Sequence, residues 1–464
     1  MTCQDPLDDS VLASFTDGFR GDVFHPGNER YDDARTVWNA AVEREPAFVA
    51  RCTGTADVIT ALNIAREHDL PLAVRATGHN VAGTAICDGG VVIDIRSIDG
   101  IRVDPKTKTA RVQPGATWGD FDHETQAFGL AAPGAQAPNV GVIGATLGGG
   151  IGWLSRKYGL TVDNVLSADV VTAEGKLVRA SADENPDLFW GLRGGSGNFG
   201  IVTCLELQLH EIGTQVLAGS LLYPLEEAGL VLRQYRDWMA DAPKEINSLV
   251  SVLELPSAPH IPAGRHGARA VMIGVCYTGD PETGDAMLAP LRGSGEPFVD
   301  TIRQRPYVEW QQAGKSDTVM RTYQTSHYFE RLSDELIDAY VEWVTDAPSS
   351  GAAAYFLAHD GAVTDVPSDA TAYPHRNASY LLVIEARWRN PERDDRHITW
   401  AREGFETLRP YATGGMWVNA LGEHRNRDYI TAAYGDNYDR LVDTKFRWDP
   451  DNRFRTNHNI EPRG

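Results

Sequence analysis

A histidine flanked by glycines is the first group in this chain whose setting suggests chemistry. His79 lies in the run 74–83, Val-Arg-Ala-Thr-Gly-His-Asn-Val-Ala-Gly, directly after an apolar segment typical of a strand. Glycine allows positive φ and a close approach of the backbone to a ligand. Successive N–H groups in such a turn suit a pyrophosphate, and Arg75 supplies matching charge. On its pattern alone, such a loop is more often a plain turn.

A second glycine-rich stretch strengthens the ligand hypothesis. Residues 141–153 read Gly-Val-Ile-Gly-Ala-Thr-Leu-Gly-Gly-Gly-Ile-Gly-Trp, and two such loops could clamp one long, phosphate-bearing cofactor. A third stretch, 195–200, matches the G-x-G-x-x-G pattern of nicotinamide-dependent enzymes. That pattern requires a strand before it and a helix after it, whereas here a helix-like segment precedes and a strand-like run follows. We therefore reject a classical dinucleotide fold and interpret the third stretch as a further backbone contact to the same cofactor.

Composition narrows the class of protein. The 464 residues, 42% of them hydrophobic, suggest two or three domains. With 43 Lys and Arg against 64 Asp and Glu, the formal net charge is −21, which disfavours nucleic acid and anionic membranes as partners. The same charge is compatible with a halophilic source and with an ordinary acidic enzyme. We expect a cytoplasmic protein, because no signal peptide and no membrane-spanning run is recognisable. We further expect a monomer or homodimer.

The five cysteines have no C-x-x-C spacing. They therefore indicate neither a disulfide framework nor a zinc site, and we expect no metal.

Helices and strands alternate around these loops, which predicts an α/β or α+β fold. Hydrophobic periodicity and turn residues delimit the elements. The first part is predicted to contain a helix from a Thr55 cap to His68, strands at 91–95 and 110–113, a helix at 117–128 and a hairpin at 168–178. Beyond residue 212, strands at 269–275 and 380–386 and a helix at 335–341 are predicted, before a tail from Arg425 that combines a helix with an extended strip.

Four motifs, in this order, resemble the berberine-bridge-enzyme-like flavoproteins of the vanillyl-alcohol-oxidase superfamily. They are the loop 74–83, the stretch 141–153, the segment 193–203 and the tail motifs at 434–438 and 449–454. The resemblance extends from about residue 35 to the C-terminus. It implies an α+β fold with a two-lobed FAD-binding domain at 1–212, an inserted substrate domain at 213–418 with an antiparallel sheet backed by helices, and a C-terminal segment, 419–464, that returns to the FAD domain.

The resemblance also implies how FAD is attached. In this family the histidine at the position of His79 carries the flavin through its 8α-methyl group; the alternative is a non-covalent His79 beside the ring. Many relatives have a second link through a cysteine, at the place where this chain has Ala137. Alanine cannot form that bond, so a single link is expected, as in the hydroxynicotine-oxidase branch.

The cofactor contacts implied by the resemblance lie in the three glycine-rich loops and the tail. They are Arg75, Ala76, Thr77, Gly78, His79, Asn80, Val81, Gly83, Val142, Gly144, Ala145, Thr146, Gly149, Gly152, Trp153, Gly197, Gly200, Ile201, Val202, Asn457 and Asn459.

The catalytic base is less evident. Relatives often have Tyr-x-Asn where this chain has Trp417-Val418-Asn419, and tryptophan has no phenol to act as a base. Asn419 remains a candidate beside flavin N5 or the substrate. His375 and Tyr434 are candidates for a proton role, although both could equally be structural. Further candidates for the substrate site are Tyr323, His359, Asp360, Tyr373 and Trp417.

Val140 bears on the electron acceptor. In the resembling enzymes, the third residue after the second attachment position lies beside flavin C4a, and valine there favours reaction with oxygen. We therefore predict an FAD-dependent oxidase that takes a hydride from a small organic substrate (an alcohol, sugar, amine or secondary metabolite) and passes the electrons to dioxygen, giving hydrogen peroxide. The alternatives are a dehydrogenase with another acceptor, a flavin-binding protein with a degenerate pocket, and a nicotinamide-dependent enzyme.

Overall fold

The first two sheets present the predicted glycine loops. The computed structural model describes residues 9–315, 318–422 and 427–463. The first sheet has the order β1 (Asp22–Phe24), β2 (Phe48–Arg51), β4 (Val91–Asp94) and β3 (Leu72–Arg75), with β2, β4 and β3 parallel. Because β3 ends at Arg75, its carboxyl end leads directly into the loop that contains His79.

The second sheet is antiparallel and lies beside the first. Its order is β5 (Ile101–Asp104), β6 (Thr109–Val112), β10 (Ile201–Gln208), β8 (Val165–Val171) and β9 (Leu177–Ser181). The short pair β7 (Leu130–Ala131) and β11 (His210–Glu211) follows it. The predicted hairpin is confirmed as β8–β9. Strand β10 directly follows the loop 195–200, as predicted.

The helices of this part connect and cover the two sheets. They are α1 (Asp9–Gly18), α2 (Tyr31–Arg35), α3 (Thr55–Glu67), α4 (Trp118–Gln126), α5 (Val142–Leu147), α6 (Ser155–Tyr158) and α7 (Pro186–Leu192). The predicted cap of α3 is wrong by one residue: Gly54 is the N-cap and Thr55 begins the helix. Thr117 does cap α4. Its hydroxyl accepts the N–H of Asp120, and the Asp120 carboxylate accepts the N–H of Thr117 in return.

The third sheet has eight strands, all of them from residues 215–388. Its order is β15 (Val299–Asp300), β12 (Gln215–Pro224), β14 (Arg269–Tyr277), β13 (Ile246–Glu254), β18 (Ala352–Ala358), β19 (Tyr380–Trp388) and β17 (Arg321–Phe329), with β16 (Arg303–Pro306) also paired to β12. Every pairing in it is antiparallel. Its helices are α8 (Ala228–Ala240), α9 (Pro281–Arg292), α10 (Tyr307–Gln311), α11 (Asp334–Thr345) and α12 (Asp394–Leu408).

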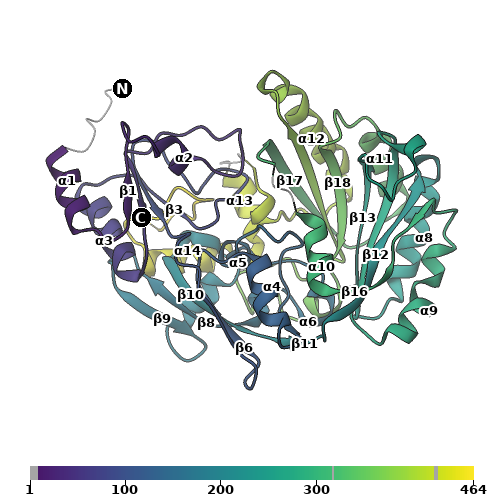
Figure 1. Cartoon of the computed structure of the whole chain (residues 1–464), viewed down its shortest axis with the longest axis horizontal. Helices are drawn as coiled ribbons and strands as arrows, with labels where there is room; N and C mark the ends of the chain where they lie inside the picture. The colour runs from purple at the N-terminus through teal and green to yellow at the C-terminus, as the bar shows by residue number, and fades with distance from the viewer. Residues whose placement is uncertain (1–8, 316–317, 423–426, 464) are drawn as a thin grey trace.

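The two faces of this sheet have different neighbours. Side chains alternate between the two faces along a strand. On one face, Leu382 and Ile384 of β19 belong to the core that contains Trp343 of α11 and Trp400 of α12. Val383, between them, packs with Tyr373 and with the glycine-rich stretch. We call this second side the inner face; it is turned toward the two smaller sheets, as Figure 1 shows.

The C-terminal helices return to the first part of the molecule. They are α13 (Arg427–Tyr434) and α14 (Tyr438–Trp448), and Figure 1 shows both beside the N-terminal sheets. The predicted tail is thus two helices and an extended strip, although Arg425 itself lies outside the described residues. Cys52, Cys87, Cys204 and Cys276 are free and buried, and Cys3 also lies outside the described part. None of the described helices has the length and apolar character needed to cross a bilayer.

Candidate active site

The first two glycine loops are tied together by Thr77. Its hydroxyl oxygen accepts the N–H of Gly141 at 3.1 Å and lies 3.3 Å from Nδ1 of His79. Gly78 and Gly83 have φ of +77° and +68°, a conformation that other residues rarely adopt. The loop that carries His79 is therefore fixed against the second glycine-rich stretch, as the hypothesis of a single clamped cofactor requires.

The third loop is held by the tail. Asn457 donates from Nδ2 to the carbonyl of Gly197 at 2.8 Å, and Asn198 donates to the carbonyl of His458. Lys445, fully buried, donates to the carbonyl of Asn198 at 2.9 Å and pairs with Asp449 at 2.6 Å. Segments more than 240 residues apart in the sequence thus meet at one place.

The second stretch approaches the segment 417–419 too closely for side chains. A Cβ on Gly148 would lie 2.0 Å from Oδ1 of Asn419, and one on Gly149 would lie 2.9 Å from the ring of Tyr373. Asn419 donates to the carbonyl of Ala145, and the indole of Trp417 donates to that of Gly148, both at 2.9 Å. Asn419 therefore lies at the second glycine loop.

The surroundings of His79 suit a neutral imidazole. Trp38 stacks on its ring with centroids 5.5 Å apart and planes at 27°. Burial lowers the pKa of His79 to about 4, so the ring is uncharged at neutral pH and keeps a nitrogen lone pair.

Several shielded polar atoms here lack a hydrogen-bond partner among the described residues. They are Nε2 of His79, Oδ1 of Asn457 and Oδ1 of Asn459. Buried polar atoms are normally paired, so these residues fit a site completed by a polar cofactor such as FAD.

The side chain of Arg75 points in a different direction from the one predicted. Its side chain is 4% exposed, and its guanidinium donates to the carbonyl of Ala34, behind the loop. Burial lowers its pKa to about 10. Its charge therefore points into the protein. The side chain lies against the loop at Gly78, where a Cβ would be 3.3 Å from Nε of Arg75. A contact between Arg75 and a phosphate would have to come from its main chain.

His375 and Tyr434 both contact main-chain carbonyls. His375 donates from Nε2 to Ala433 at 3.0 Å, and the Tyr434 hydroxyl donates to Gly195 at 3.4 Å. Burial lowers the pKa of His375 to about 4 and raises that of Tyr434. These contacts favour structural roles for the two side chains.

The other sequence-predicted candidates are distributed over different places. Tyr323 lies on the helix-covered face, with the guanidinium of Arg402 from α12 5.6 Å from its ring, so its prediction as a substrate-site residue is wrong. Asp360 forms an ion pair with Arg156. His359 and Tyr373 are buried, with Nε2 of His359 3.1 Å from the Tyr373 hydroxyl. Trp153 packs on Trp310, with ring centroids 5.1 Å apart.

An acid that the sequence analysis missed lies on the inner face. Glu385 is in the middle of β19 and pairs across the sheet with Gln324 of β17, whose amide donates to its carboxylate. The neighbours of Glu385 on this face are Tyr355 and Arg387, as their electrostatic interactions with it show. Burial raises the pKa of Glu385, although Arg387 and the Gln324 hydrogen bond oppose the shift. The signal in the sequence was a lone acid within an otherwise apolar run.

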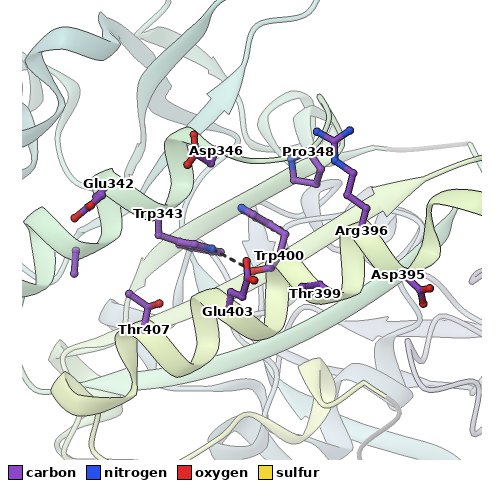
Figure 2. Close-up of a pocket in the computed structure, with 11 residues that line it drawn as sticks. Glu342, Trp343, Asp346, Pro348, Asp395, Arg396, Thr399, Trp400, Glu403 and Thr407 are labelled. Atoms are coloured by element: carbon purple, nitrogen blue, oxygen red, sulfur yellow. Dashed lines mark hydrogen bonds between the residues drawn. The ribbon is translucent and has the colours of Figure 1, made fainter.

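A groove on the opposite face is unrelated to this site. It lies between α11 and α12, has a volume of about 710 Å³, and is shown in Figure 2. Trp343 and Trp400 stack at its base with centroids 4.6 Å apart. The whole thickness of the sheet separates it from Glu385 and His79.

Comparison with known proteins identifies the family to which this chain belongs. Residues 46–181 match the family model "FAD binding domain", and residues 404–461 match "Berberine and berberine like". The chain is 31% identical to (R)-6-hydroxynicotine oxidase of Paenarthrobacter nicotinovorans over 464 residues, covering 96% of this chain and 97% of that one. The chain belongs to the berberine-bridge-enzyme-like FAD-linked oxidoreductases. The carbohydrate oxidase of Microdochium nivale is a further relative of this family, 28% identical over 94% of this chain and 92% of its own.

Solved structures agree with membership of the berberine-bridge-enzyme-like family. The crystal structure of 6-hydroxy-D-nicotine oxidase from Arthrobacter nicotinovorans superposes with a TM-score of 0.86 at 29% identity, covering 96% of this chain and 99% of that one. Chitooligosaccharide oxidase, at 23% identity, has the same fold with a TM-score of 0.85. The α+β fold predicted from the motifs and the prediction of an FAD-linked oxidoreductase are confirmed.

Proposed function

We propose that this FAD-linked oxidoreductase is an oxidase that takes a hydride from a C–H bond of a small organic substrate and delivers the electrons to dioxygen. FAD, when bound, accepts the hydride and gives up the electrons. We further propose that residues 1–212 and 419–464 bind FAD and that residues 213–418 bind the substrate. The glycine-loop, His79 and tail residues expected from the sequence are the proposed FAD contacts, those of Arg75 through its main chain.

The single observation that carries this proposal is the position of Glu385. It is an acid on the inner face of the sheet, and its neighbour Arg387 lies 5.4 Å from the ring of Trp38, which stacks on His79. Burial raises the pKa of Glu385. A general base works best when its pKa is close to the working pH. We assign Glu385 the role of base, which accepts the proton from the O–H or N–H of the substrate as the neighbouring C–H bond breaks. Trp417 cannot have this role.

The proposed attachment of FAD is a single covalent bond through His79. The neutral imidazole and its unpartnered Nε2 support a nucleophilic ring. Ala137 has no atom that could form a second bond. Purified protein precipitated with acid should keep its yellow colour, whereas the His79→Ala variant should lose it while remaining folded. Flavin that stays with denatured His79→Ala protein would refute the assignment.

The role of Glu385 is tested by rapid-mixing measurement of flavin reduction without oxygen. Glu385→Gln should slow reduction by about two to four orders of magnitude and leave the flavin content unchanged. Glu403→Gln, an exposed acid on α12 of the opposite face, is the matched control and should leave the rate unchanged. If both variants reduce flavin at the wild-type rate, Glu385 is not the base. Peroxide release in air then distinguishes an oxidase from a dehydrogenase.

A further inference from the structure

Most polar side chains on the inner face are already engaged within the chain. Asn247 donates to the carbonyl of Gly152 at 2.9 Å. The Ser251 hydroxyl donates to Ala354 at 2.9 Å, and the Ser326 hydroxyl accepts the N–H of Trp417 at 2.8 Å. Polar groups that are satisfied in this way offer little to a ligand with many hydroxyls, since each such hydroxyl needs partners of its own when it leaves water.

Glu385 offers a hydrogen-bond acceptor at the centre of this face. Glu385 has two carboxylate oxygens with several lone pairs, and the amide of Gln324 occupies only part of them. A ligand that donates one O–H or N–H would find its partner here.

Half-buried aromatic side chains surround this acceptor. Tyr355 and Trp417 pack against the cluster that contains Val383, and Tyr355 pairs with Val383 across the sheet. Trp38 lies at the other side, where the guanidinium of Arg387 is 5.4 Å from its ring. The partly exposed residues of β18 and β19 are Ala353, Tyr355, Glu385 and Arg387, and they alternate with buried ones. All four therefore lie on one face of the sheet, the inner face. Flat aromatic side chains favour a flat apolar ligand.

We propose that the substrate is an aromatic or heteroaromatic ring compound with one O–H or N–H donor on the carbon to be oxidised, rather than a saccharide. This inference rests on the proposed function and specifies its substrate class. The ring contacts Tyr355 and Trp417, and the donor binds Glu385. The C–H bond gives its hydride to FAD and the O–H or N–H bond gives its proton to Glu385, so a C=O or C=N bond forms. Dioxygen takes up the two electrons as hydrogen peroxide.

The test compares two sets of probes on the holoenzyme without oxygen. 4-Hydroxybenzyl alcohol and benzylamine represent the proposed class, and D-glucose and cellobiose represent saccharides. At least one ring compound should bleach the flavin, and neither sugar should do so at the same concentration. For the reacting compound, Tyr355→Leu should raise KM by about tenfold, more than it lowers kcat, because apolar contact area is lost. Tyr355→Phe keeps the ring and should remain within about twofold of wild type.

The outcomes separate this inference from the function on which it rests. Bleaching by a sugar in preference to the ring compounds would overturn the substrate class and leave the oxidase proposal intact. Bleaching by a ring compound that is unaffected by Tyr355→Leu would overturn the placement of the ring. If the ring compounds neither bleach the flavin nor perturb its absorption, the substrate class is wrong. If a ring compound bleaches the flavin and the colour returns only very slowly in air, the oxidase assignment is wrong and the substrate class stands.

Discussion

Asn39 binds Thr322 through both atoms of its side-chain amide. Its Oδ1 accepts the N–H of Thr322 at 2.8 Å, and its Nδ2 donates to the carbonyl of Thr322 at 2.9 Å and to that of Val81 at 2.7 Å. One buried side chain therefore connects the loop of His79 to β17, an edge strand of the large sheet. This connection fixes the distance between the histidine and the face that carries Glu385.

Replacing Asn39 with alanine should loosen this connection. Three main-chain groups would lose their partner in a buried place, so we expect the free energy of unfolding to fall by about 2–4 kcal/mol. Flavin reduction should slow as well, because the sheet is no longer held at a fixed distance from the loop. Thermal unfolding and rapid-mixing kinetics measure the two effects. Asn28→Ala, in an exposed turn, is the control; equal losses for both variants would contradict the assigned role.

Val140 is predicted to set the reaction with oxygen. It lies directly before the second glycine stretch, donates its N–H to Ala137 at 3.3 Å and is partly buried. Val140→Leu adds one methylene where we expect dioxygen to approach, so reoxidation of reduced flavin should slow at least about tenfold. Reduction by substrate should remain unchanged. Mixing reduced enzyme with aerated buffer measures this rate, and an equal effect on both half-reactions would show that the substitution distorts the site generally.

Substitutions at His375 and Tyr434 should affect stability more than chemistry. His375→Ala removes a buried hydrogen bond and leaves space beside Gly415, on which the ring packs. We expect the free energy of unfolding to fall by about 1–3 kcal/mol and flavin reduction to change by less than about tenfold. Tyr434→Phe should have the smaller effect on stability, since its hydrogen bond to Gly195 is long. A loss of two orders of magnitude in flavin reduction in either variant would restore that residue as a catalytic candidate.

Asp122 should make stability depend on pH. It lies on α4, is 1% exposed and accepts a hydrogen bond from Gln311 of α10 at 2.8 Å. Burial raises its pKa to about 7, partly opposed by that hydrogen bond. A raised folded-state pKa contributes stability that is complete below the unfolded pKa of about 3.9 and is lost as the pH rises through about 7.

The corresponding measurement is unfolding from pH 4 to pH 8 for wild type and Asp122→Asn. The difference between them should change by up to about 4 kcal/mol across this range and become constant above it. Asp120→Asn, exposed on the same helix, should not remove the pH dependence. A constant difference between wild type and Asp122→Asn would mean that the acid is already ionised at pH 4.

The loops were predictable from the sequence because their requirement is local. Gly78 and Gly149 have φ of +77° and +120°, so the turns themselves require glycine, whatever the rest of the chain does. Glu385 was not found, because its role depends on which face of β19 it occupies and on pairing with a strand 61 residues away. The direction of the Arg75 side chain was also predicted wrongly, because it depends on a partner that is remote in the sequence. That partner is the carbonyl of Ala34, in α2.

The tail that we propose to close the FAD site also affects when this protein can acquire its cofactor. Lys445 and Asn457 hold the loop around Gly197 and Asn198 although they lie 247 and 260 residues further along the chain. These contacts can form only after the tail has been synthesised, so we expect flavin loading to require the tail as well as the glycine loops. Cells short of riboflavin should accordingly accumulate full-length, colourless protein that turns yellow when FAD is supplied later.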